Sequence, residues 1–188
     1  MASVKLNPAI ESIRGKVGNL VFKSFEGREI VAQMPDFTGR VFTDAQKAAQ
    51  ERFRKAAGYG ETVMADEQAK TLYEQVAKSR KQPLFSLIMQ DFLNDPHVDE
   101  VDLSGYKGQT GEKIFVLASD DFEVAAVHVA ISRESGEPIE AGAAVKTAAD
   151  PGRWMYTTTS SAPPGAPVKI QVSVTDRPGH TVIRTETK

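Results

Sequence analysis

Hydrophobic and polar residues alternate in two short runs near the start of the chain. The first run spans residues 15–25 and the second spans residues 28–34, with Glu26 and Gly27 between them. Two extended runs around a tight, glycine-containing connection predict a β-hairpin. Because an isolated hairpin is only marginally stable in water, we expect this one to pack on another element or to pair with another chain.

The next part of the chain repeats its apolar residues every three or four positions, which is typical of amphipathic helices. Thr43 and Gln46 have the spacing of a capping box, so a helix of about 20 residues is expected from that point. Asp66 can cap a second helix, and Pro83 fits the first turn of a third helix that stops at residues 94–96. The expected buried faces are Ala45, Ala49, Phe53, Ala56, Ala57, Gly60, Val63 and Met64, then Ala69, Leu72, Tyr73, Val76 and Ala77, then Leu84, Leu87, Ile88 and Phe92.

From Val98 onward the pattern changes to period two. Alternating runs separated by Gly, Pro, Ser and Asp predict about seven strands in roughly 90 residues, which is typical of a β-sandwich. The pattern does not decide whether residues 100–107 are a linker or the first strand. We therefore predict an α+β protein with two domains, a β-hairpin and three-helix region at residues 1–96 and an antiparallel sandwich at residues 97–188.

Two segments resemble known bacterial families. The strand that begins at Val168 ends in an Asp-x-x-Gly run, Asp176 to Gly179, before the last strand, and in this feature residues 99–188 resemble bacterial immunoglobulin-like domains. This resemblance implies an Ig-like sandwich that acts as an adhesive, spacing or decorating module without chemistry of its own. Residues 15–19, Gly-Lys-Val-Gly-Asn, and residues 45–53, Ala-Gln-x-x-x-Gln-x-Arg-Phe, resemble an uncharacterised bacterial family, which implies a grouping but no activity.

Composition narrows the function by exclusion. Hydrophobic residues make up 40% and charged residues 26% of the 188 positions, and a net charge of −2 gives no general attraction to polyanions. The absence of cysteine excludes disulfides and thiolate sites. The first eight residues contain no apolar signal-peptide segment, and no apolar run is long enough to cross a bilayer. We expect a protein made in the cytoplasm without a signal peptide and without a membrane partner.

The candidate catalytic groups are scattered. His97, His128 and His180 form no metal-ligand pair, and no Gly-x-Ser-x-Gly elbow accompanies them. The aspartates of the sandwich could contribute to a calcium site at one end, but aspartates in turns commonly accept hydrogen bonds from their own backbone instead. These aspartates are Asp120, Asp121, Asp150 and Asp176. We predict no catalytic residue, no metal ligand and no cofactor, and hence no enzymatic activity.

The remaining hypotheses concern partners. The first is a non-enzymatic structural or interaction protein, a self-associating subunit or decoration of a larger assembly such as a phage-like particle or a filament. In this hypothesis the hairpin contacts another protein chain, and the expected docking residues are Leu20, Phe22, Ile30 and Val31.

Two alternatives use other residues. Lys16, Lys23 and Arg28 could follow a phosphate backbone, which would make the chain a nucleic-acid-binding protein. A sandwich that binds polysaccharides would need Trp154 and Tyr156, which alternate on one strand, to be exposed.

Overall fold

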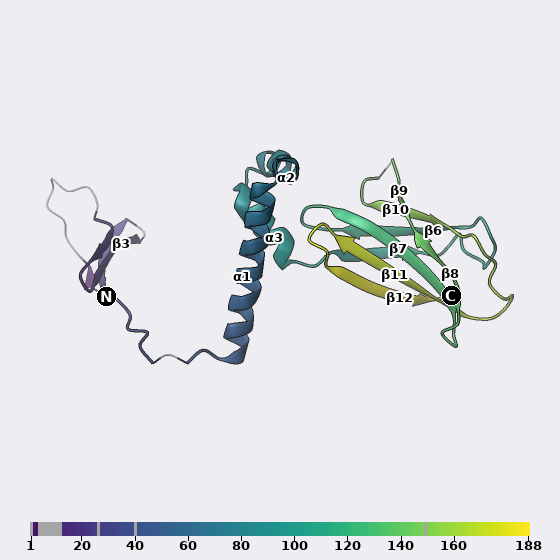
Figure 1. Cartoon of the computed structure of the whole chain (residues 1–188), viewed down its shortest axis with the longest axis horizontal. Helices are drawn as coiled ribbons and strands as arrows, with labels where there is room; N and C mark the ends of the chain where they lie inside the picture. The colour runs from purple at the N-terminus through teal and green to yellow at the C-terminus, as the bar shows by residue number, and fades with distance from the viewer. Residues whose placement is uncertain (1, 4–12, 26, 40, 149) are drawn as a thin grey trace. The chain divides into compact units, whose positions relative to one another are not determined.

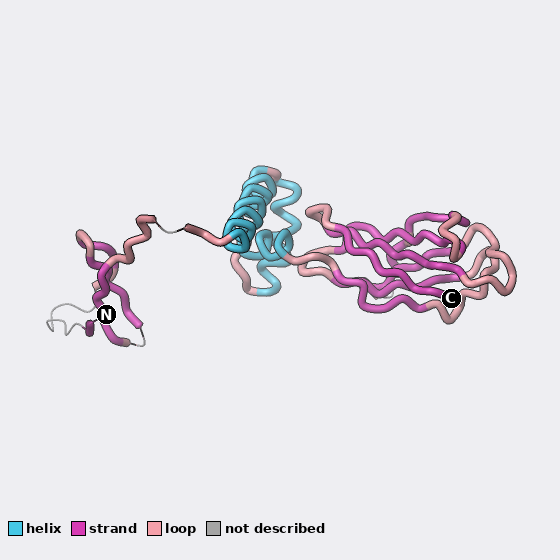
Figure 2. Tube along the Cα trace, turned by 90° about the horizontal axis from the view of Figure 1, so that it is seen from below, coloured by secondary structure: helices cyan, strands magenta, loops and turns pink. Residues whose placement is uncertain are grey.

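The computed structural model of the chain describes residues 2–3, 13–25, 27–39, 41–148 and 150–188. The chain divides into two compact units, Met1–Asp44 and Ala45–Lys188. The first unit is a β-sheet, and the second contains helices and two further sheets (Figures 1 and 2). The predicted α+β class is confirmed. The sequence predicted no signal peptide in the first eight residues, and most of these residues lie outside the described part of the chain.

The first unit is a four-stranded antiparallel sheet with the strand order β1-β4-β3-β2. Strands β3 and β4 form the predicted hairpin, with Gly27 at φ +74° in its turn; Glu26 lies outside the described residues. The expected first run of the hairpin is itself broken at Gly18, whose φ of +59° allows a tight turn between β2 and β3. The strands are β1 (Ala2–Ser3), β2 (Gly15–Val17), β3 (Leu20–Phe25) and β4 (Arg28–Gln33).

The three predicted helices form at the start of the second unit: α1 (Asp44–Ala65), α2 (Glu67–Arg80) and α3 (Leu84–Leu93). Asp66 caps α2, because its Oδ1 accepts hydrogen bonds from the backbone N–H groups of Gln68 and Ala69 at 2.9 and 3.2 Å. The core shared by these helices consists of Val63, Tyr73, Ala77, Leu87 and Ile88.

Part of the predicted face is wrong for α1 and for α2, whereas none of the four residues predicted for α3 is exposed. Phe53 and Met64 of α1 and Leu72 of α2 are exposed, with 61%, 39% and 42% of their surface accessible. Helix α1 has 22 residues, whereas α2 has 14 and α3 has 10, so the shorter helices cannot cover the whole length of α1. Helical periodicity therefore identified the helices correctly but overestimated the extent of the buried stripe.

The rest of the second unit consists of two four-stranded antiparallel sheets, with strand orders β5-β6-β10-β9 and β12-β11-β7-β8. One core cluster draws on both sheets, as in a β-sandwich, and includes Val116 of β6, Val129 of β7 and Ile170 of β11. Residues 97–102 are the first strand, so the stretch left undecided begins as a strand and becomes a loop. The strands are β5 (His97–Asp102), β6 (Lys113–Ser119), β7 (Val124–Arg133), β8 (Pro138–Ala143), β9 (Val145–Lys146), β10 (Arg153–Thr157), β11 (Val168–Asp176) and β12 (Thr181–Thr187).

Candidate interaction surfaces and a buried carboxyl pair

The described residues of the first unit form a sheet without a core of its own. None of its described residues is buried, and large apolar side chains such as Val17, Leu20 and Phe25 are 66%, 44% and 61% exposed. A sheet in water normally becomes stable by packing one apolar face against another layer. The sheet therefore presents apolar surface that is available to a partner.

The strand register sorts the side chains of this sheet onto two different faces. Val17 lies opposite Leu20 across the β2–β3 pair, and Phe22 lies opposite Val31 across the β3–β4 pair. Leu20 and Phe22 are two residues apart on β3, so all four share one face, which we call the apolar face. Its one ionisable residue in the three strands β2–β4 is Glu29, which pairs with Ser24 next to the hairpin turn.

The opposite face of the sheet collects cations. Lys16 lies opposite Val21, Lys23 lies opposite Ile30 and Arg28 lies opposite Phe25. Because Val21, Lys23 and Phe25 alternate on β3, these residues project from the side opposite Phe22. We call this side the cationic face; it is formed by Lys16, Val21, Lys23, Phe25, Arg28, Ile30 and Ala32.

The register therefore separates the residues expected to dock a protein partner. Leu20, Phe22 and Val31 come together on the apolar face, whereas Ile30 lies on the cationic face. The three cations that could contact a polyanion all share the cationic face. Whether any of them binds a partner stays a prediction.

In the second unit, the loop between β6 and β7 joins the helices to the sandwich. The carboxylate of Asp121 accepts hydrogen bonds from the side-chain amides of Gln90, at 3.0 Å, and Asn94. Its backbone carbonyl accepts one from Arg80. In the same loop Phe122 stacks on Tyr73 of α2, with 3.8 Å between ring centroids. We call this contact region the junction.

Next to the junction, the carboxyl group of Asp91 is fully buried. Asp91 of α3 is 0% exposed, and its Oδ2 accepts a hydrogen bond from the hydroxyl of Tyr73, which lies 3.0 Å from the hydroxyl of Tyr59. Burial raises the pKa of Asp91 to about 7, against a lowering by the Tyr73 hydrogen bond and with further increases from Asp120 and Asp176. Burial also raises the pKa of Tyr73 and that of Tyr59.

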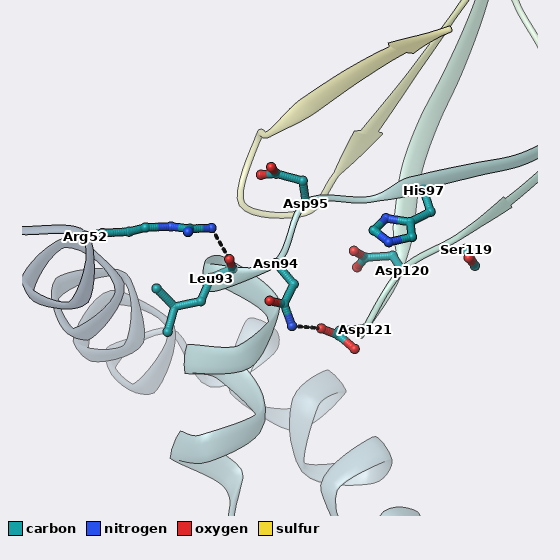
Figure 3. A pocket seen from close by; sticks show the side chains of 8 residues that line it. All are labelled: Arg52, Leu93, Asn94, Asp95, His97, Ser119, Asp120 and Asp121. Carbon is teal, nitrogen blue, oxygen red and sulfur yellow. Dashed lines mark hydrogen bonds between the residues drawn. The ribbon is translucent and has the colours of Figure 1, made fainter. Parts of the chain in front are cut away.

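A cleft of about 600 Å³ opens beside the junction (Figure 3). Asp120, Ser119 and His97 are among its lining residues, a combination that would invite comparison with a hydrolytic triad. Within the part of the chain that the structure describes, however, no hydrogen bond joins His97 to either of the other two. Its lining residues are Arg52, Leu93, Asn94, Asp95, His97, Ser119, Asp120 and Asp121.

Three of the sandwich aspartates organise turns, as expected. Asp120 Oδ2 accepts hydrogen bonds from the backbone N–H groups of Phe122 and Glu123. Asp150 Oδ1 accepts one from the backbone N–H group of Gly152. Asp176 Oδ1 accepts from the backbone N–H groups of Gly179 and His180 at 2.7 and 2.6 Å, which explains the Asp-x-x-Gly run in physical terms. Among the described residues, no group of three or more His, Asp and Glu side chains is arranged to hold a metal ion.

The two aromatic residues considered for polysaccharide binding belong to the core. Trp154 and Tyr156 of β10 are 7% and 4% exposed and pack in the sandwich cluster. Carbohydrate recognition by stacking needs an accessible ring face, so these two residues cannot provide it.

Comparison with known proteins identifies no family. No protein-family model matches the chain, and no curated protein matches it. A solved structure described as the crystal structure of CopC from Methylosinus trichosporium OB3b is similar at 15% identity and a TM-score of 0.37, over 49% of this chain and 89% of that chain. Among the described residues, no helix has the length and apolar character needed to cross a membrane.

Sequence reasoning missed two features of these sites. The division of the hairpin into two unlike faces depends on the turn at Gly18, which sets the register of β2 against β3. The buried carboxyl pair depends on Asp91, the one charged residue of the helix α3, Leu-Phe-Ser-Leu-Ile-Met-Gln-Asp-Phe-Leu. A charge at a position that helical periodicity assigns to the buried side was the available signal for the second feature.

Proposed function

We propose that this chain is a non-enzymatic interaction protein that self-associates through the apolar face of its N-terminal sheet. The observation that carries this proposal is a four-stranded sheet in which no described residue is buried. Covering Val17, Leu20, Phe22 and Val31 would remove apolar surface from water, which is the main source of free energy for protein association. In a larger assembly, such as a filament or a particle, this contact would link neighbouring copies.

The charge distribution of the apolar face suits a second copy of the same chain. Its ionisable residue in β2–β4, Glu29, lies at the hairpin end, and its centre consists of the Phe22–Val31 pair. Two copies packed face to face with their strands reversed would place the two Glu29 side chains at opposite ends. The identical patches would then meet without like-charge repulsion, as a two-fold symmetric interface requires.

The test is a pair of charge substitutions on the two faces. Val17→Glu combined with Leu20→Glu places carboxylates on the apolar face, at exposed positions that the sheet tolerates without losing a core contact. In the reversed packing these positions lie at the end where Glu29 of the second copy is expected, so the added charges repel it. The matched control is Phe25→Glu on the cationic face. We expect light scattering to show concentration-dependent association of the unmodified chain, its loss in the double variant and its retention in the control. Association that is insensitive to the double substitution would refute the proposed interface.

A second function is favoured by one specific observation, the common location of Lys16, Lys23 and Arg28 on the cationic face. Phe25 lies among them and is 61% exposed, and cations interspersed with an accessible ring are typical of surfaces that bind single-stranded nucleic acid. Each neutralised contact should reduce the slope of log affinity against log salt by about 0.7 for a single strand. Replacing the three residues with Gln, with Arg in place of each Lys as the control, tests this function by titration with an oligonucleotide at low salt.

We also infer that the sandwich is an Ig-like module. The strand orders β5-β6-β10-β9 and β12-β11-β7-β8 correspond to the ABED and GFC arrangement of Ig domains, with β8 added beside β7. Such a module supports a spacing or display role for the second unit. Truncation to residues 45–188 should leave a monomeric unit that still unfolds cooperatively when followed by Trp154 fluorescence, and aggregation of that fragment would contradict this role.

A further inference from the structure

The buried carboxyl pair at the junction has an incomplete set of hydrogen bonds. Asp91 Oδ1 and Asp120 Oδ1 are both buried, and neither has a donor among the described residues. The two carboxyl groups are nevertheless within hydrogen-bonding range of each other. Two ionised carboxylates are acceptors only, so they would leave both oxygens unsatisfied and would repel each other. A single proton on Asp91 lets it donate to Asp120 and satisfies both atoms.

The two residues of this pair come from different parts of the second unit, one from the helices and one from the sandwich. Asp91 is on α3, whereas Asp120 is in the β6–β7 loop of the sandwich, next to the residue that binds Gln90 and Asn94. We propose that Asp91 and Asp120 form a proton-linked latch, in which the shared proton holds the helices against the sandwich and its loss loosens the junction.

The groups that face the pair support this assignment. Tyr73 of α2 donates to Asp91, and Tyr59 of α1 hydrogen-bonds to Tyr73. Asp176, the last residue of β11, adds negative charge. His180, in the turn that follows, has its Nδ1 2.9 Å from Asp176 Oδ2 and its ring nearly perpendicular to that of Phe92. Arg177 lies 6.0 Å from the ring centroids of Tyr73 and Phe122 and pairs with Glu123 at 3.6 Å. On the cleft side of Asp120 the ionisable neighbours are His97 and Asp121, and Arg80 donates to the backbone carbonyl of Asp121.

Among these described neighbours, no cation forms an ion pair with Asp91. Solvent can reach the pair from the side of Asp120. Asp120 lines the open cleft of Figure 3, so a proton can exchange through that wall. Because burial raises the pKa of Asp91 to about 7, the latch would open in the physiological range. The stabilisation from the proton is complete below the pKa of an unfolded aspartate, near 4, and is lost as the pH rises through about 7.

Because the chain contains no cysteine, thiol-reactive spin labels attach only to cysteines that are introduced. Lys78→Cys on α2 and Ile183→Cys on β12 place spin labels at two exposed sites, with side-chain and residue exposures of 80% and 57%. Distances between the labels are then measured by double electron–electron resonance at pH 6 and pH 8.5. We expect one narrow distribution at pH 6 and a second, broad population at pH 8.5. For a one-proton latch, the ratio of the broad to the narrow population rises about tenfold per pH unit above 7.

Two variants separate the latch from other titrating groups. Asp91→Asn supplies a permanent amide donor to Asp120, and Asp120→Asn supplies one from the other side, so both should give the narrow distribution at either pH. His180→Asn removes the imidazole that contacts Asp176 and Phe92, and should keep the pH dependence. A distribution that does not change with pH in the labelled parent, a pH dependence that survives in Asp91→Asn, or one that is abolished by His180→Asn would overturn the proposal.

Discussion

The N-terminal sheet and the C-terminal sandwich are both antiparallel β-structures with alternating side chains, yet they satisfy that pattern in different ways. In the sandwich, alternate residues such as Ile114, Val116, Ile170 and Val172 are fully buried between two sheets. In the N-terminal sheet, the same alternation leaves every described residue at least partly accessible. The difference teaches that alternation specifies a face, whereas a core requires a second layer to cover it.

The largest expected effect distinguishes the two regions by core deletion. Ile170→Ala removes side-chain atoms from the centre of the sandwich and should lower the free energy of unfolding by about 2–5 kcal/mol. Ile30→Ala makes the same chemical change in the N-terminal sheet, where the residue is only partly buried, and should cost under about 1 kcal/mol. Urea unfolding monitored by Trp154 fluorescence follows the sandwich, and hydrogen exchange of the amides of β4 in the same urea series follows the N-terminal sheet. Equal losses would mean that the sheet contributes to the same core.

An intermediate effect is expected at the helical end of the second unit. Tyr73→Phe keeps the ring but removes the donor to Asp91 Oδ2, and should lower the free energy of unfolding by about 1–3 kcal/mol. Because that hydrogen bond lowers the pKa of Asp91, its loss should also raise this pKa. Tyr59→Phe is the control, since Asp91 keeps its donor there. Carbon-13 NMR titration of the aspartate carboxyl groups follows the shift, and a lower Asp91 pKa in Tyr73→Phe would contradict the described contact.

The smallest expected effect concerns a single helix cap. Asp66→Ala removes the acceptor for two backbone N–H groups at the start of α2 and should cost about 1 kcal/mol. Asp66→Asn keeps an acceptor and should retain most of the stability. Thermal unfolding followed by circular dichroism at 222 nm measures both variants. If Ala and Asn had the same effect, the loss would come from the charge and not from the cap.

The sequence was sufficient for features that depend on local chemistry. The cap at Asp66, the stop before Pro96 and the turns at Gly27 and Gly179 all follow from residue types with a specific backbone role, and the structure contains them. The burial of Trp154 was left open because alternation alone cannot say which face of a strand is covered.

Features that depend on tertiary contacts could not be predicted. On β7 the buried residues are Val124 and then Val127, Val129 and Ile131, because a register irregularity between Thr175 and Asp176 of the neighbouring strand changes the alternation. The meeting of Asp91 with Asp120 joins a helix to a loop 29 positions later in the chain, and no local pattern encodes that contact. The candidate site residues of the hairpin were chosen by residue type, but their division between two faces required the strand register.

The most direct test of the central claim, that the N-terminal sheet is completed by a second copy, is hydrogen exchange across a concentration series. We predict that the backbone amides of residues 15–33 exchange rapidly in dilute solution and become protected as the mass measured by light scattering increases. The amides of β7 and β11 should be protected throughout, because their core lies within one chain. A chain that stays monomeric at every concentration with residues 15–33 fully protected would contradict the claim.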